Sequence, residues 1–282
     1  MIIANSSRIL SAVSRLTIRS IAVDHAQQSV IYTRNESFIV EQAKPNDAGR
    51  IIDFLANVFT FTEPHCRALG MTSEESKPFI AMIAEKCLPY GLSCVVTEER
   101  SKQLAAVRLF GIIARDDSPQ EPIQLPAKAQ IIARLLDETK KGFWDMVDVS
   151  VRRVVAREIT SVSKQHMHKG IATFLLSHLL DESNVRRLDV QGIISEASSI
   201  QNQRLLRKAG YEAYNEIKHS EYLDENGIIS EASSIQNQRL LRKAGYEAYN
   251  EIKHSEYLDE NGHRIFNCDD GTDRIVLFFK KL

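Results

Sequence analysis

The feature that most constrains this fold is a perfect tandem duplication near the C-terminus. Residues 192–226 recur without a change at 227–261, as the unit GIISEASSIQNQRLLRKAGYEAYNEIKHSEYLDEN. A 35-residue period also occurs in helical solenoids. However, two copies are too few to stack into a stable array, and each copy has a strand–helix–strand pattern. Because substitutions accumulate with time, the identity indicates a recent duplication or an error in assembling the sequence.

One position in a sheet cannot hold both copies of this unit. One copy must therefore enter the fold, while the other is looped out or packed on the surface. Such an insertion costs little, about 0.6 kcal/mol per doubling of loop length. Copy 1 follows the helix expected after Gly170, and copy 2 precedes the last apolar segment of the chain. We favour copy 1 as the copy within the fold.

Hydrophobic periodicity over the rest of the chain predicts one α/β domain spanning residues 36–282. The expected strands are 38–40, 93–97, 104–113, 157–163, 192–195, 211–219 and 274–279, with a short charged turn joining the second and third into a hairpin. The expected helices are 51–59, 76–87, 131–136, 171–179 and 200–209. Gly210 follows the last of these helices, where a C-cap glycine is typical.

Charge and cysteine content narrow the class of protein. Lys plus Arg number 36 against 37 for Asp plus Glu, so no basic surplus favours nucleic-acid binding. The sequence has no run of 18 apolar residues, and we expect no membrane partner. The cysteines, which lack the short paired spacing of metal or disulfide frameworks, are Cys66, Cys87, Cys94 and Cys268. We interpret them as reduced thiols of an intracellular protein.

Residues 1–35 are expected to form a disordered or targeting extension outside the domain. Arg8, Arg15 and Arg19 lie among serines, and no acid precedes Asp24. This composition is typical of a mitochondrial transit peptide, but it also fits a disordered cytoplasmic extension. The expected location is therefore cytoplasmic, with the mitochondrial matrix as the alternative.

The segment 161–172 has the pattern of a strand, a polar loop and a helix start. The free backbone N–H groups at a helix start attract anions, and the helix dipole adds to this attraction. No acid occurs from 159 to 180, whereas Lys164 and Lys169 lie in the loop. Gly170 permits a close backbone approach. The pattern favours a pyrophosphate site, although a plain strand–loop–helix with a glycine start is the alternative.

This loop resembles the CoA-binding turn of the GNAT superfamily of N-acyltransferases, Gln/Arg-x-x-Gly-x-Gly/Ala. The matching string runs from Met167 to Ala172, where Met167 departs from the usual Gln or Arg and Gln165 lies close by. The resemblance implies a mixed, mostly antiparallel sheet flanked by helices, with acetyl-CoA as the acetyl donor. The cofactor-binding residues that it implies are Ser161, Val162, Gln165, His168, Lys169, Gly170, Ile171, Ala172 and Asn202.

A second block of the same family, a helix that carries an Asn and ends in Gly-aromatic, matches Asn202 and Gly210-Tyr211. Copy 2 repeats the block with Asn237 and Gly245-Tyr246. A polar Asn in an apolar stripe needs a partner. That partner is either the cofactor, as the resemblance implies, or a local hydrogen bond near the helix start.

Within the superfamily, the chain is most similar to the arylalkylamine N-acetyltransferase-like proteins of invertebrates. The string Phe61-Thr62-Glu63-Pro64 resembles their substrate-side segment. The resemblance makes Glu63 the general base, and an exposed acid that begins a helical turn is the alternative. It also marks Ser198 as a catalytic residue, although helix capping by Ser198 or Ser199 is the alternative.

Two further roles follow from the resemblance. The backbone N–H of Val162 is placed to stabilise the oxyanion of the tetrahedral intermediate. The family's tyrosine general acid corresponds to Leu206, so the proton must return by another route, such as water. His166 and His168 are interpreted as residues of a solvated loop, because a metal site needs more ligands.

These residues predict an enzyme that transfers an acetyl group from acetyl-CoA to a primary amine, a small arylalkylamine-type molecule. The alternatives are a CoA-binding module of this fold with weak or no catalysis, and a duplication product that does not fold. The expected partners are the small amine and no nucleic acid, and the expected state is a monomer or weak dimer. We expect segments around 60–90 and 115–150 to form the acceptor pocket.

Overall fold

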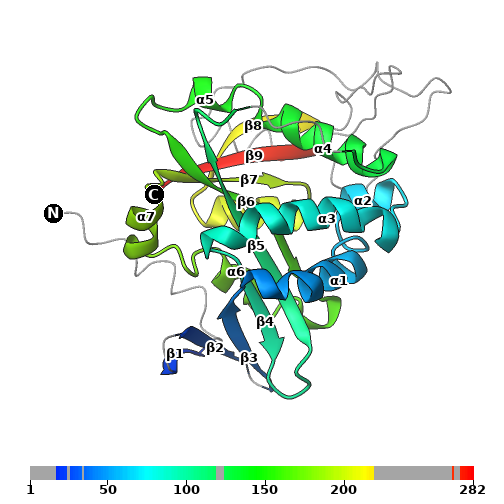
Figure 1. The fold of residues 1–282 in the computed structure, drawn as a ribbon, viewed down its shortest axis with the longest axis vertical. Helices are drawn as coiled ribbons and strands as arrows, with labels where there is room; N and C mark the ends of the chain where they lie inside the picture. The colour runs from blue at the N-terminus through cyan, green and yellow to red at the C-terminus, as the bar shows by residue number, and fades with distance from the viewer. Residues whose placement is uncertain (1–16, 24–25, 34, 119–123, 219–268, 270–273) are drawn as a thin grey trace.

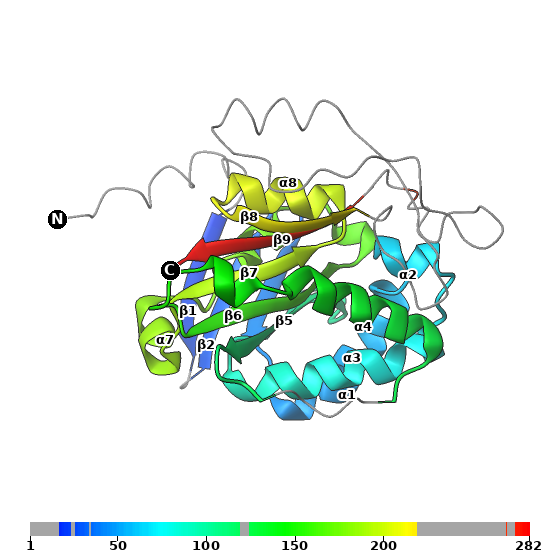
Figure 2. The ribbon, with the colours of Figure 1, turned by 90° about the horizontal axis from the view of Figure 1, so that it is seen from above.

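The computed structural model describes residues 17–23, 26–33, 35–118, 124–218, 269 and 274–282. These residues form one nine-stranded sheet with helices on both faces (Figures 1 and 2). The strands are β1 (Thr17–Val23), β2 (Ala26–Tyr32), β3 (Ser37–Gln42), β4 (Cys94–Glu98), β5 (Leu104–Ala114), β6 (Arg153–Val162), β7 (Gly192–Ala197), β8 (Glu212–Lys218) and β9 (Arg274–Lys281). The helices are α1 (Ala48–Val58), α2 (Pro64–Ala68), α3 (Ser73–Cys87), α4 (Ala127–Lys140), α5 (Phe143–Met146), α6 (Ile171–Leu175), α7 (Glu182–Leu188) and α8 (Ile200–Lys208).

The sheet is mixed and mostly antiparallel, as expected. Its strand order is β1-β2-β3-β4-β5-β6-β7-β9-β8, and β6 with β7 is the parallel pair. Figure 2 shows α1, α3 and α4 along one face of the sheet and α8 on the other. The site described below lies where β6 and β7 meet, in the middle of this sheet.

Copy 1 of the duplicated unit supplies β7, α8 and β8. In the sheet, β9 lies between β7 and β8 and pairs antiparallel with both. Gly210 follows α8 with a φ of +80°, in the left-handed region where a C-cap glycine is favoured. The prediction that copy 1 enters the fold is confirmed, and copy 2 lies outside the described residues.

The prediction that residues 1–35 lie outside the domain is wrong for the segment 17–32. In the structure β1 and β2 form a hairpin, and β2 pairs antiparallel with β3. Ile31 is fully buried and Val30 nearly so, because the apolar end of β2 packs into the core beside Phe38. Residues 1–16, which carry two of the three arginines noted above, lie outside the described part.

The region after Gly170 also differs from the prediction of one helix over 171–179. The helix α6 is shorter and ends at Leu175, turns follow it, and Leu179 then takes a left-handed φ of +60°. Asp181 then caps a separate helix, α7, with its side chain accepting from the N–H of Asn184. In addition, β6 begins at Arg153 rather than at residue 157.

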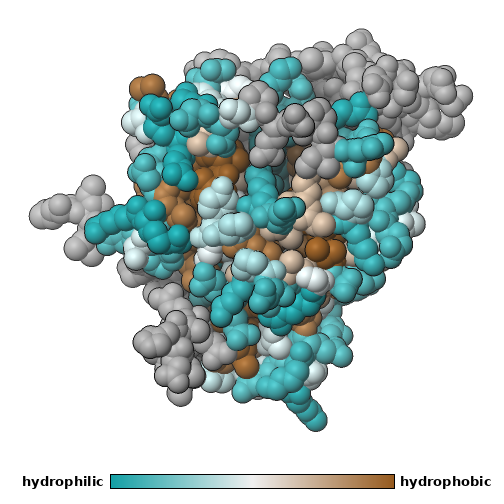
Figure 3. Space-filling view, in the orientation of Figure 1, coloured by the Kyte–Doolittle hydropathy of each residue, from teal (hydrophilic) through white to brown (hydrophobic). Residues whose placement is uncertain are grey.

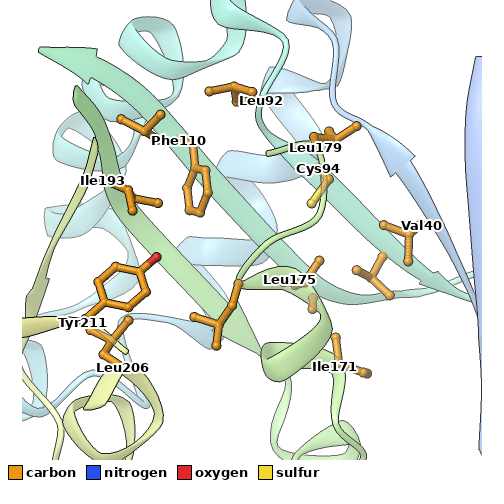
Figure 4. Packing of buried hydrophobic residues seen from close by; sticks show 14 of the residues in the cluster. Val40, Leu92, Cys94, Phe110, Ile171, Leu175, Leu179, Ile193, Leu206 and Tyr211 are labelled. Atoms are coloured by element: carbon orange, nitrogen blue, oxygen red, sulfur yellow. The ribbon is translucent and has the colours of Figure 1, made fainter. Parts of the chain in front are cut away.

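Two hydrophobic clusters cover the two faces of the sheet. The cluster shown in Figure 4 lies on the α6 and α8 face and includes Phe110, Leu175 and Leu206. The other lies under α1, α3 and α4 and includes Leu55, Ile80 and Leu109. The three cysteines within the described residues are buried and free, as expected of reduced thiols, whereas Cys268 lies outside this part. No helix of the described part is long and apolar enough to cross a membrane.

Candidate active site

The site begins with a break in the pairing of β6. Opposite β5, the register passes from Leu109↔Ile159 to Phe110↔Arg157, so Glu158 is an extra residue of a β-bulge. A bulge bends the strand that carries it, although β6 stays paired with β5 on both sides of this one. On its other edge β6 pairs with β7 only over Val154–Ala156, and the described residues show no pairing between them beyond that point. The two strands therefore separate after the bulge.

A cavity of about 410 Å³ opens where the strands separate. The loop after β6 (residues 163–170, called below the phosphate loop after its predicted role) and α8 line it on one face of the sheet. The helices α2, α3 and α4 line it on the other. Figure 3, seen from the α3 and α4 face, shows patches of apolar residues within a mostly hydrophilic surface. The lining of the cavity includes Phe79, Ile83, Ile132 and Leu136, which come from the segments 60–90 and 115–150 that were predicted to form the acceptor pocket.

The open edge of β6 presents backbone groups to this cavity. The N–H of Ser163 donates to the carbonyl of Ala105 on β5, 2.9 Å away. Because alternate residues of a strand direct their N–H groups to opposite edges, the N–H groups of Val162 and Thr160 point away from β5. Both residues line the cavity. The N–H of Val162 thus lies on the edge of β6 that faces away from β5, and its oxyanion role stays a prediction.

The loop after β6 takes a conformation that exposes backbone N–H groups. Gly170 caps α6 with a φ of +79°, and His168 has a φ of +60°. Among the predicted cofactor-binding residues, those that line the cavity are Ser161, Val162, His168, Gly170, Ile171, Ala172 and Asn202. The first N–H groups of any helix lack intrahelical partners, so this end of the cavity can accept an anion.

Two predicted cofactor residues are placed differently. Gln165 is not among the cavity-lining residues. Lys169 forms an ion pair with Glu36, whose acid offsets part of the positive charge expected in the loop. His166, interpreted as a solvated loop residue, is buried, and its Nδ1 lies 2.7 Å from the Ser163 hydroxyl. Burial and, secondarily, the charge of Lys169 lower the pKa of His166 below its usual value.

One carboxylate oxygen of Glu63 caps a helix, and the other accepts no hydrogen bond from the described residues. It caps α2, with Oε2 accepting the N–H of Cys66 at 2.6 Å. Its other oxygen, Oε1, is buried, has no hydrogen-bond partner among the described residues and lies 3.5 Å from Nδ1 of His65. Glu63 is buried and lines the cavity, so the alternative of an exposed acid is wrong. Burial, then the charge of Glu63, raise the pKa of the Cys66 thiol far above its usual range.

At the start of α8, the two serines have different surroundings. Both serines line the cavity, but only Ser199 caps the helix, where its hydroxyl accepts the N–H of Asn202 at 3.2 Å. The Asn202 side chain accepts from Nη1 of Arg157 at 3.0 Å, a partner that neither alternative anticipated. Leu206 is buried in the core, and its neighbour Leu205 lines the cavity instead.

The cavity also holds three charged side chains that the sequence predictions missed: the buried Arg157 and the partly buried Glu158 and Glu196. Glu158 pairs with Lys86 at 2.9 Å, and Glu196 pairs with Lys140 at 2.8 Å. Burial favours the neutral form of Glu158, but the two lysines outweigh it and lower the pKa of this carboxyl. The available signal was a pair of charges, Arg-Glu, in the middle of the apolar run of β6. Within the described residues, no cluster of three or more His, Cys, Asp or Glu side chains could hold a metal ion.

Comparison with known proteins identifies the fold. The sequence matches no protein-family model and no curated protein. Among solved structures, arylalkylamine N-acetyltransferase 2 from Aedes aegypti matches with a TM-score of 0.64 and 19% identity, covering 86% of this chain and 98% of that chain. The polyamine N-acetyltransferase of Drosophila melanogaster matches with a TM-score of 0.59 and 15% identity, covering 87% and 100%.

A third match is mosquito arylalkylamine N-acetyltransferase like 5b, with a TM-score of 0.58 and 15% identity, over 87% of this chain and 100% of that one. The chain thus has the GNAT-type fold of these insect acetyltransferases, and the resemblance drawn from the loop and helix motifs is confirmed at the level of fold. At such identity the matches say nothing of the substrate.

Proposed function

We propose that this chain is an acetyl-CoA-dependent N-acetyltransferase whose acceptor is a small primary amine of the arylalkylamine type. The observation that carries the proposal is the cavity between β6 and β7. Among the described residues, it joins an anion-accepting loop, a strand edge without pairing and a buried carboxylate with one oxygen that accepts no hydrogen bond. These are the three parts that acetyl transfer to an amine requires.

The residues divide the reaction between the two faces of the sheet. Glu63 takes one proton from the bound ammonium, which frees the nitrogen lone pair to bond to the acetyl carbon, and the second N–H proton leaves the tetrahedral intermediate to water. The carbonyl electron pair moves to oxygen, and the Val162 N–H stabilises that oxyanion. When the intermediate collapses, the C–S bond breaks and its electron pair leaves with sulfur. The phosphate loop holds the donor through its exposed N–H groups.

The acceptor side of the cavity favours a cationic amine with an apolar body. Phe59, Phe79 and Ile83 supply apolar surface, while Glu63 supplies negative charge. An ammonium group is attracted to this carboxylate before Glu63 takes its proton, and an aryl or alkyl group packs on the phenylalanines. This combination supports an arylalkylamine rather than an acidic or uncharged acceptor.

The second candidate function is a CoA-binding module without catalysis. The observation in its favour is that α8 lines the cavity with Gln201, Asn202 and Leu205, none of which titrates. A helix without a proton donor leaves the departing thiolate without a general acid. Turnover distinguishes this candidate from the enzyme.

The first test is the thermal unfolding of the purified chain with and without acetyl-CoA. A ligand at 100 times its Kd stabilises the fold by about 2.7 kcal/mol, which a melting curve resolves. Thiol release is then followed with a panel of arylalkylamines, polyamines and amino acids. A shift with turnover supports the enzyme, and a shift without turnover on any amine supports the binding module. A cooperative melt that acetyl-CoA leaves unchanged contradicts both.

A further inference from the structure

Arg157 is a buried cation without a carboxylate partner in the described part of the chain. Only 3% of the residue is exposed, and its Nη1 donates to Oδ1 of Asn202. Its Nε has no hydrogen-bond partner among the described residues. Buried charges are normally paired because leaving water is costly. Arg157 lines the cavity, so it is available to a ligand there.

The acids of the cavity do not compensate this charge. Glu158 and Glu196 each pair with a lysine, from α3 and α4 respectively. Arg157 lies opposite Phe110 on β5, and Phe110 belongs to the cluster on the α6 and α8 face. Residues directly opposite each other in an antiparallel pair share a face. The cavity therefore has a cation on the α8 face, whereas its paired acids lie toward α3 and α4.

This placement matches the path of the acetyl donor. In the proposed function the donor's phosphates bind at the loop after Val162, and its arm runs along the open edge of β6 toward the bulge. At about 3.3 Å per residue, the backbone positions of Val162 and Arg157 are separated by roughly 16 Å along the strand. The sulfur is bonded to the carbon whose oxygen faces the Val162 N–H, so the guanidinium on the long side chain of Arg157 approaches it from the bulge side of the same cavity.

We infer that Arg157 is a catalytic residue that stabilises the CoA thiolate as it leaves, in place of a general acid, and that Asn202 positions its guanidinium. The inference rests on the proposed function. The C–S bond breaks, the electron pair stays on sulfur and the thiolate forms a charge-assisted hydrogen bond with Arg157. One ammonium proton goes to Glu63 and the second to water, and the thiolate is protonated by water after release.

Charge stabilisation suits this leaving group better than proton donation. A thiol has a pKa of about 8.5, so a fixed cation nearby can hold it as the thiolate at neutral pH. Burial lowers the pKa of Arg157 itself to about 10, which still leaves the guanidinium charged at pH 7. Asn202 fixes its direction before the reaction, as electrostatic stabilisation requires.

The test measures the pKa of the CoA thiol when it is bound to the whole chain, from the ultraviolet absorbance of the thiolate. Calorimetry with CoA first establishes saturation. In the wild type we expect the bound thiol to titrate at least one unit below free CoA. In R157Q it should return to the free value or above, and in R157K or N202A it should lie between. R186Q, a change at an exposed arginine on α7, is the control and should match the wild type.

Turnover gives a second readout. R157Q should lower kcat about 100-fold or more, with little change in the KM for acetyl-CoA, because the charge interaction develops only as sulfur leaves. If saturated wild type binds CoA with the thiol pKa of free CoA, the inference is overturned whether or not the variants fold. An absence of CoA binding would overturn the proposed function as well, so the two failures are distinguishable.

Discussion

Replacing Glu63 by Gln separates the two roles that one side chain performs at the cavity. Oε2 accepts the Cys66 N–H at 2.6 Å and caps α2, whereas Oε1 is buried without a partner in the described structure. Gln keeps an acceptor oxygen for the cap and removes the base. Ala removes both, which makes E63A the matched control.

The two variants should differ in stability and resemble each other in activity. Loss of a cap costs about 1 kcal/mol, so E63A should melt roughly 2–4 °C below the wild type, whereas E63Q should melt close to it. Loss of a general base typically lowers the rate by about 10²–10⁴-fold. That range corresponds to roughly 3–5 kcal/mol of transition-state stabilisation in both variants.

The assay is thiol release at saturating acetyl-CoA with an arylalkylamine, from pH 6 to pH 10. Below its own pKa of about 10, an alkylamine gains roughly tenfold in its neutral fraction per pH unit. A base becomes unnecessary as the amine loses its proton unaided, so the deficit of E63Q should shrink with rising pH. An E63Q variant with wild-type kcat at pH 7 would refute the base and leave Glu63 a helix cap.

Three further results are expected. S199A should lower the melting temperature by a few degrees through the loss of about 1 kcal/mol of helix capping, whereas S198A should leave it unchanged and lower kcat if Ser198 is catalytic. K140M leaves Glu196 buried and unpaired, so urea unfolding should show a loss of about 3 kcal/mol, which the double variant K140M/E196Q should largely restore. The pKa of Glu158 is lowered in the folded state, so the unfolded chain binds more protons in acid. The ionised Glu158 therefore stabilises the fold above about pH 4.3, and this contribution is lost as the pH falls further. The urea midpoint of E158Q should accordingly fall less steeply between pH 5 and 3 than that of the wild type.

The local sequence predicted much of the fold, because its elements have clear periodicity and punctuation. The hairpin of β4 and β5 and the helices α1, α3 and α8 lie where apolar spacing placed them. The loop ending in Gly170 and its following helix start are visible in the residue types alone. The N-terminal hairpin was missed, because the composition of that segment resembles a targeting peptide and its strands are stabilised by pairing with β3.

The candidate site shows the same division. Glu63, Ser198, Asn202 and most of the loop residues were named through the resemblance to the family's motifs, and in the structure they line the cavity. The bulge at Glu158 and the separation of β6 from β7 depend on strand register, which single-sequence patterns do not contain. The unpaired charge of Arg157 likewise depends on which distant side chains reach it, and only tertiary packing decides that. The sequence by itself determined which segments form helices and strands and which residue types occupy the loop after β6. The tertiary structure decided which charges are paired and where the cavity opens, because burial and pairing join residues that are far apart in the chain.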